Sequence, residues 1–192
     1  MPINKLTQWL NKENSVGAPD PAQAVLATST IDAIPHSRVV AIREISQEGL
    51  LFFTQRGTKK VEELNVNPRV SLTFWFELTE RQITIEGTVT PLTETENNNY
   101  WVAHPRFSQL RFYAYAPTSS QEISSKQILE DKKNTISKQF DGQVIPMHPL
   151  YCGYRIKPIK FLFYAYRTDE LSDVAAYLKQ ADGSWVEKII SP

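Results

Sequence analysis

A ten-residue stretch, RQITIEGTVT at residues 81–90, alternates apolar and polar side chains along its length. In an extended strand the apolar residues Ile83, Ile85 and Val89 fall on one face, and the polar residues fall on the other. A period of two is typical of a strand in an antiparallel sheet that buries only one face. The stretch therefore predicts such a strand, and it limits the fold to one that contains a half-buried sheet.

Further segments with strand-like patterning are separated by turns. They are residues 24–28, 36–45, 50–55, 69–77, 153–166 and 175–190, the last with a hairpin signal at Asp182-Gly183. Helical patterns occupy residues 5–14, 58–66, 93–103 and 124–140, whereas residues 106–123 are aromatic and irregular. We predict a mostly β (β plus α) fold, an antiparallel barrel of about six strands with flanking helices. It forms a single domain over residues 1–192, of which residues 1–20 are an N-terminal helix and lead-in.

Composition narrows the class of protein without naming a function. Lys+Arg and Asp+Glu each number 21, whereas general nucleic-acid or anionic-membrane binders usually carry a basic excess, so neither partner is expected. The one cysteine, Cys152, makes an internal disulfide impossible and favours a cytoplasmic location. We see no apolar run of about 18 residues that would span a membrane, and no signal peptide at the N-terminus.

The stretch RGTKKVEEL, residues 56–64, concentrates positive charge where the second helix should begin. A helix start presents amide N–H groups and a partial positive charge that bind phosphate well, and Thr58, Lys59 and Lys60 would add a hydroxyl and two charges. Arg38 and Arg43 precede them, but their spacing of five puts them on opposite faces of an ideal strand. A twist, a bulge or a subunit boundary would be needed for both to line one site. Solvated charges are the alternative explanation.

Other candidate residues give weaker signals. The histidines share no ligand spacing, so no metal site is predicted; they are His36, His104 and His148. Cys152 has no CxxC partner and is interpreted as an inert thiol. An aromatic cluster could stack on a planar ligand, although packing in the core or between subunits is favoured; its members are Phe107, Phe112, Tyr113 and Tyr115.

The order of the segments resembles the pyridoxamine 5'-phosphate oxidase family of FMN-binding split barrels, from about residue 24 to residue 192. The resemblance rests on SRVVAIREI, LFFTQRGTKKVEELNVNPRVSLTFWF, ERQITIEGTVTPL, YWVAHPRFSQL, GYRIKPIKFLFY and GSWVEKIISP, in that order and spacing. It implies a homodimer with FMN at the subunit interface. It also implies that residues surrounding the cofactor are Arg38, Val39, Val40, Arg43, Phe53, Thr54, Thr58, Lys59, Lys60, Gln82, Ser119, Ser120 and Tyr164.

The same resemblance implies a substrate site, but the match is thinner there. The family holds its substrate phosphate with Lys, Tyr, Arg and Ser, and these positions read Arg43, Tyr100, His104 and Ser108 here. The family motif Arg-Leu-His-Asp-Arg reads ELSDV at residues 170–174. The Arg and the His that hold the substrate in the family are Glu170 and Ser172 here. Losing one charge-assisted hydrogen bond costs roughly 1.5–3 kcal/mol, so losing both would weaken substrate binding by roughly 10²–10⁴-fold.

These similarities lead to two expectations for function. The first is an FMN-dependent oxidase similar to pyridoxamine 5'-phosphate oxidase, acting on a small planar substrate that need not be the phosphorylated pyridine. FMN would carry the chemistry, so no side chain is assigned as a catalytic acid or base. The alternative is an FMN-binding protein without turnover, a carrier or a sensor. The altered residues 170–174 favour the alternative, whereas Tyr100 and Ser108 favour the oxidase.

Overall fold

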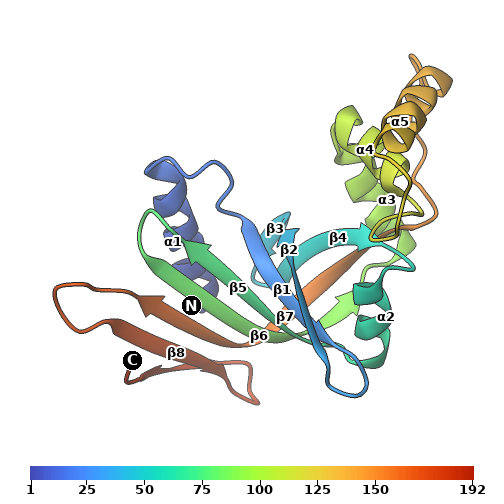
Figure 1. The fold of residues 1–192 in the computed structure, drawn as a ribbon. Helices are drawn as coiled ribbons and strands as arrows, with labels where there is room; N and C mark the ends of the chain where they lie inside the picture. The colour runs from blue at the N-terminus through green and yellow to red at the C-terminus, as the bar shows by residue number, and fades with distance from the viewer. The chain divides into compact units, whose positions relative to one another are not determined.

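The structure is a computed structural model that describes residues 1–192, and most of its regular structure is a nine-stranded sheet (Figure 1). The strands are β1 (Gln23–Ser29), β2 (Pro35–Ala41), β3 (Glu44–Ser46), β4 (Gly49–Gln55), β5 (Arg69–Phe76), β6 (Arg81–Pro91), β7 (Tyr151–Ala165), β8 (Asp173–Lys179) and β9 (Trp185–Ile189). The helices are α1 (Pro2–Ser15), α2 (Lys59–Val66), α3 (Glu94–Ala103), α4 (Arg106–Tyr115) and α5 (Gln127–Gln139).

The strand order is β2-β1-β5-β6-β7-β4-β3, with β8 added to β7 and β9 added to β8. The registers of β1 with β2 and β5, of β5 with β6, and of β7 with β8 are antiparallel. These features confirm the prediction of a mostly antiparallel sheet with flanking helices. The sequence pattern indicates seven strand-like segments, and two of them, residues 36–45 and 175–190, each contain two strands, which gives the nine observed instead of about six.

The chain consists of two compact units. The first unit comprises residues 1–52, 63–90 and 154–192, and the second comprises residues 53–62 and 91–153. Strands β4 and β7 and helix α2 run through both. The predicted single domain over the whole chain stays a prediction.

In the first unit the strands curl into a half-barrel (Figure 1). Buried apolar side chains form its core. The alternation read from residues 81–90 is present in β6, where Ile83, Ile85 and Val89 are buried. Strand β5 alternates in the same way and buries Leu72 and Phe74 completely. The core of this unit therefore follows directly from the period of two in its strands.

Helix α1 packs against other elements of the first unit through one apolar side and one buried acidic residue. Trp9 meets the ring of Phe163 edge to face, with ring centroids 5.2 Å apart. Glu13 is only 2% exposed and accepts hydrogen bonds from the Leu78 amide (2.9 Å) and the Thr79 hydroxyl (2.8 Å). These two bonds attach the end of α1 to the turn between β5 and β6.

The predicted strand over residues 36–45 is interrupted because the chain changes pairing partner. The amide of Ile42 donates to the carbonyl of Ala22 (2.9 Å), whereas the amide of Arg43 donates to the carbonyl of Leu51 (2.8 Å). Strand β2 therefore pairs with β1, and β3 pairs with β4. The interruption lies between Arg38 and Arg43, so the alternation of an ideal strand does not fix the directions of their side chains.

In the second unit, helices α3, α4 and α5 gather together (Figure 1). Thr93 caps α3 and forms a capping box with Glu96. Helix α4 occupies part of a segment predicted to be irregular. Its aromatic residues do not follow one face, but Phe112 packs edge to face on the buried Trp101, and the side chain of Gln109 donates to the Trp101 carbonyl (2.8 Å). Tertiary contacts thus hold a helix whose sequence pattern does not predict it.

Candidate anion and flavin site

Arg38, on β2 of the first unit, is held by partners on two other elements. Its Nη1 donates to the hydroxyl of Thr28 on β1 (2.5 Å) and lies 3.4 Å from the carbonyl of Leu26. Its Nη2 lies 3.5 Å from the carboxylate of Glu63 on α2. The register of β1 with β2 places Leu26 opposite Arg38 and Thr28 opposite His36, which explains why these side chains meet.

Glu63 brings a negative charge into this cluster. It is 3% exposed, accepts a hydrogen bond from the Thr28 hydroxyl, and has its Oε1 2.7 Å from Nδ1 of His36. Burial alone would raise the pKa of this carboxyl, but the Thr28 hydrogen bond and the charges of His36 and Arg38 outweigh burial and hold the pKa below its ordinary value. Glu63 is therefore a buried carboxylate that is stable only with these partners.

The predicted helix start lies in the second unit and contains Thr58, Lys59 and Lys60. Thr58 is buried, and its hydroxyl donates to the carbonyl of Gln55 (2.8 Å) while accepting from Nζ of Lys60 at 3.5 Å. Gly57, just before it, has φ +77°, a left-handed conformation that glycine adopts without strain. The tight turn thus brings the chain from β4 into α2. Thr54, at the end of β4, is half-buried, and its carbonyl accepts from the Cys152 thiol at 3.6 Å.

The remaining predicted cofactor residues of the first unit lie on several strands. Val39 is 61% exposed, Val40 is half-buried and Arg43 is exposed. The side chain of Gln82 donates to the hydroxyl of Thr84, two residues along β6 (3.2 Å). Tyr164 on β7 stacks at a tilt on Tyr166 at 4.2 Å and pairs in register with Val174 of β8.

In the second unit, three predicted residues do come together. The ring of Phe53 is 5.0 Å from that of Tyr100 and 5.7 Å from that of His104. The buried Tyr151 stacks on Phe53 at 5.2 Å, and its hydroxyl lies 2.7 Å from Nε2 of His104. Ser108 is half-buried in the first turn of α4. The rings of Phe53, Tyr100, His104 and Tyr151 therefore lie together and carry polar groups.

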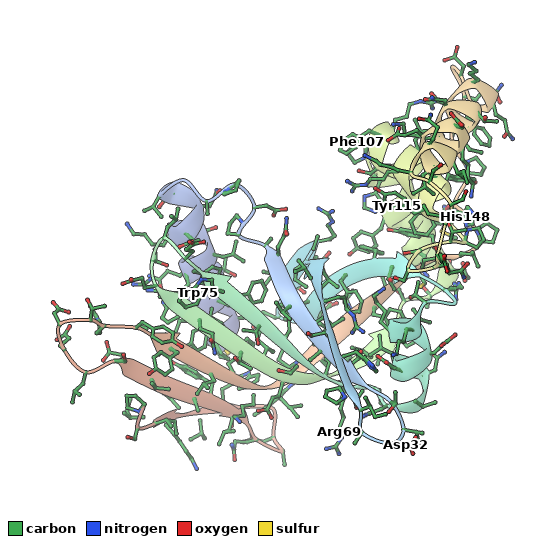
Figure 2. The ribbon with its side chains drawn as sticks, viewed as in Figure 1. Asp32, Arg69, Trp75, Phe107, Tyr115 and His148 are labelled. Atoms are coloured by element: carbon green, nitrogen blue, oxygen red, sulfur yellow. The ribbon has the colours of Figure 1, made fainter.

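Ser119 and Ser120 lie elsewhere in the second unit. They line a hollow of about 220 Å³ together with Tyr115, Thr118, Gln121, Ile123 and Leu129. Ser120 has φ +67°, which is uncommon for a residue with a side chain. Phe107 and Tyr115, from the aromatic cluster singled out in the sequence, stand exposed on α4 (Figure 2). Phe112 and Tyr113 of the same cluster pack against Trp101, so that cluster divides between surface and core.

The altered segment at residues 170–174 forms its own ion pairs. Nη1 of Arg167 lies 3.5 Å from the carboxylate of Glu170, and Nη2 lies 3.2 Å from that of Asp173. The amide of Arg167 also donates to the hydroxyl of Ser172 (3.2 Å). Val174 is buried. Arg167, just before the segment, therefore offsets part of the acidic charge of Glu170 and Asp173.

Cys152 is buried, and burial raises the pKa of its thiol to about 11. A thiol that stays protonated at neutral pH is a poor nucleophile, which supports its interpretation as inert. Thr28, Glu63 and Tyr151 belong to these clusters but are not among the site residues predicted from the sequence. The sequence alone does not indicate which of the two adjacent glutamates, Glu62 or Glu63, is buried.

Comparison with known proteins places the chain in a family. The sequence profile described as pyridoxamine 5'-phosphate oxidase matches residues 12–140. A pyridoxine/pyridoxamine 5'-phosphate oxidase of Microcystis aeruginosa is 34% identical over 191 residues, which cover 100% of this chain and 88% of the relative. An enzyme of the same name from Alteromonas mediterranea is 34% identical over 192 residues, covering 100% and 89%. The chain belongs to the pyridoxamine 5'-phosphate oxidase family.

Solved structures agree with this assignment. PhzG from Burkholderia lata, crystallised in complex with tetrahydrophenazine-1-carboxylic acid, superposes with a TM-score of 0.88 at 27% identity and covers 100% of this chain and 92% of its own. A pyridoxamine 5'-phosphate oxidase-related, FMN-binding protein from Nostoc punctiforme superposes with a TM-score of 0.80 at 16% identity, covering 100% and 98%. The second likeness shows the fold, which confirms the predicted split barrel.

Proposed function

We propose that this protein is an FMN-dependent oxidase of the pyridoxamine 5'-phosphate oxidase type. The observation that carries the proposal is similarity along the entire chain to oxidases of that name, at 34% identity. A fold shared with an FMN-binding protein supports the choice of cofactor. We propose the activity and the class of substrate from this similarity and from the chemistry of the residues described above.

The residues present fit a flavin mononucleotide. Arg38 offers a guanidinium already held by Thr28 and Glu63, and a guanidinium matches phosphate geometry. The start of α2 offers Lys59, Lys60 and a helix terminus that attracts anions. We propose that these groups hold the cofactor phosphate, and that the other predicted cofactor residues surround the ribityl chain and the ring. Those residues are Val39, Val40, Arg43, Phe53, Thr54, Thr58, Gln82, Ser119, Ser120 and Tyr164.

The bound flavin would supply the redox chemistry, accepting a hydride at N5 from the substrate carbon that bears the amine or alcohol and passing the electrons to dioxygen to give hydrogen peroxide. The protein's own residues would bind the substrate, orient it and exclude water. Phe53 and Tyr100 provide aromatic surface for a planar ring. We assign no side chain as an obligatory acid or base.

The substrate need not be pyridoxamine 5'-phosphate. The proposed substrate residues are Arg43, Tyr100, His104 and Ser108. His104 stands where the family places an arginine, and histidine carries only part of a charge near neutral pH. Its Nε2 already lies 2.7 Å from the Tyr151 hydroxyl. A small planar substrate with or without a phosphate fits this set, and PhzG, with its tricyclic ligand, gives a relative that binds another ring.

A second candidate function is flavin binding without turnover, as a carrier or a sensor. It is favoured by residues 170–174, where Glu170 and Asp173 both engage Arg167. The family residues that hold the substrate over the flavin are replaced there by Glu170 and Ser172. The retained Tyr100 and Ser108 favour the oxidase.

We further propose a cytoplasmic homodimer in which FMN lies at the subunit interface, without nucleic-acid or membrane partners. No helix in the structure has both the length and the apolar character required to cross a membrane.

The test is anaerobic reduction of the FMN-loaded protein. Pyridoxamine 5'-phosphate, pyridoxine 5'-phosphate and unphosphorylated planar amines are mixed with it, and the flavin absorbance near 450 nm is followed before air is admitted. The oxidase proposal expects bleaching with at least one substrate, followed by recovery of colour and release of hydrogen peroxide. A flavin that binds but is bleached by none of them would support the carrier or sensor instead.

A further inference from the structure

Glu63 couples three elements of the first unit. It lies on α2, its partner Thr28 lies on β1, and its partners His36 and Arg38 lie on β2, two residues apart and on the same side of the strand. Glu63 as a whole is 3% exposed. A carboxylate removed from water to this extent is costly unless it is paired and hydrogen-bonded, so its four-residue arrangement has to form as a unit.

The arrangement also fixes the direction of the Arg38 guanidinium. Both hydrogens of Nη1 are engaged, one by the Thr28 hydroxyl and one by the Leu26 carbonyl, and Nη2 forms an ion pair with the Glu63 carboxylate at 3.5 Å. A guanidinium has five N–H donors in a rigid plane, so these contacts leave Nε–H and the second hydrogen of Nη2 as the pair for an anion. The Thr28 hydroxyl connects the two residues, because it donates to Glu63 while it accepts from Arg38.

We propose that Glu63 is a positioning residue for anion binding: with Thr28 it holds Arg38 so that Nε–H and the remaining Nη2–H meet the phosphate of FMN. The inference rests on the proposed function and adds to it a residue that the resemblance does not supply. In this proposal Arg38 binds the phosphate directly, whereas Glu63 does not touch the phosphate and acts by orienting Arg38.

A different physical effect predicts the opposite outcome. The negative charge of Glu63 also repels a phosphate, so removing the charge could tighten FMN binding through long-range electrostatics. Two substitutions distinguish these effects. Glu63→Gln removes the charge but keeps an oxygen that can accept from Thr28 and Arg38, whereas Glu63→Leu removes both the charge and the acceptor at similar volume.

The experiment measures dissociation constants of FMN and of riboflavin, which lacks the phosphate, by quenching of flavin fluorescence. For Glu63→Leu we expect the constant for FMN to rise about 10-fold or more, and for Glu63→Gln we expect a value within about 3-fold of the original. Riboflavin binding should be the same in all three proteins, since Arg38 does not contact that ligand. In an Arg38→Ala background, Glu63→Leu should add nothing further.

Each contrary outcome has its own meaning. Unchanged or tighter FMN binding in Glu63→Leu overturns the positioning role while leaving the proposed function intact. Equal weakening of FMN and riboflavin assigns Glu63 a purely structural role and also overturns it. If the unsubstituted protein binds no FMN, the proposed function itself fails. Should Glu63→Leu not fold, Thr28→Val removes the connecting hydroxyl at constant shape and must weaken FMN binding in the same selective way.

Discussion

At the scale of single residues, the environment of an ionisable group decides its charge and therefore its role. Glu63 stays ionised although it is buried, because a hydroxyl and two basic side chains surround it. Cys152 is also buried, but the positive charges of Arg56 and Lys60 do not outweigh burial, and the pKa of its thiol rises to about 11. The same physical factor, removal from water, thus gives a paired carboxylate in one place and an inert thiol in another.

The lowered pKa of Glu63 predicts how stability depends on pH. A carboxyl whose pKa is lower in the folded state than its ordinary value of 4.5 contributes stability above pH 4.5, and this contribution is lost as the pH falls through the folded-state pKa. Urea unfolding measured from pH 7 downward should therefore show a steeper loss of the free energy of unfolding in the original protein than in Glu63→Gln.

Glu62→Gln is the matched control for that measurement. Glu62 is the adjacent residue on α2 and is exposed. It should follow the acid profile of the original protein closely. A Glu63→Gln protein with the same slope as the original would contradict the assigned environment.

The raised pKa of Cys152 predicts slow reaction with a disulfide reagent. At pH 8 only about a thousandth of a thiol with pKa near 11 is ionised, and it is also inaccessible. In native protein, release of thionitrobenzoate from Ellman's reagent should be far slower than in protein unfolded in guanidinium chloride, which supplies the control. Equal rates in both states would show that Cys152 is exposed.

At the scale of elements, the accuracy of prediction depends on where the stabilising contacts come from. Strand β6 was predicted from sequence because its alternation of apolar and polar side chains is itself the cause of its burial pattern. Helix α4 was not predicted, because Phe112 and Gln109 are fixed by Trp101, a residue outside the helix. The break between β2 and β3 was missed for the same reason, since it follows from a change of pairing partner.

The hydrogen bonds that Glu13 accepts from the turn between β5 and β6 lead to a prediction about how helix α1 contributes to stability. In Glu13→Leu the acceptor is lost, so the amide of Leu78 and the hydroxyl of Thr79 lose their partner in a part-buried site. Each unsatisfied donor costs roughly 1–3 kcal/mol, and we expect the free energy of unfolding to fall by about that amount or more.

Chemical denaturation at pH 7 measures this change. Glu13→Gln retains an acceptor oxygen and should lose less. An unfolding free energy for Glu13→Leu equal to that of the original protein would show that α1 does not depend on this residue.

At the scale of the whole molecule, sequence similarity over the full chain indicates which ligand to propose, which residue patterns alone did not indicate. The charge at residues 59–60 and the position of Arg38 indicated an anion site from chemistry. Only the resemblance, and then family membership, specified which anion to propose. The partners of Arg38 required coordinates, since Thr28 and Glu63 are separated by 35 residues in the chain.

The measurement that tests the central claim most directly compares the affinities of the purified protein for FMN and riboflavin at one ionic strength. Charge-assisted hydrogen bonds from Arg38 and the lysines at the start of α2 should make FMN bind at least about 100-fold more tightly than riboflavin, with a preference that falls as salt is added. Equal affinities, or no binding of either flavin, would contradict the account.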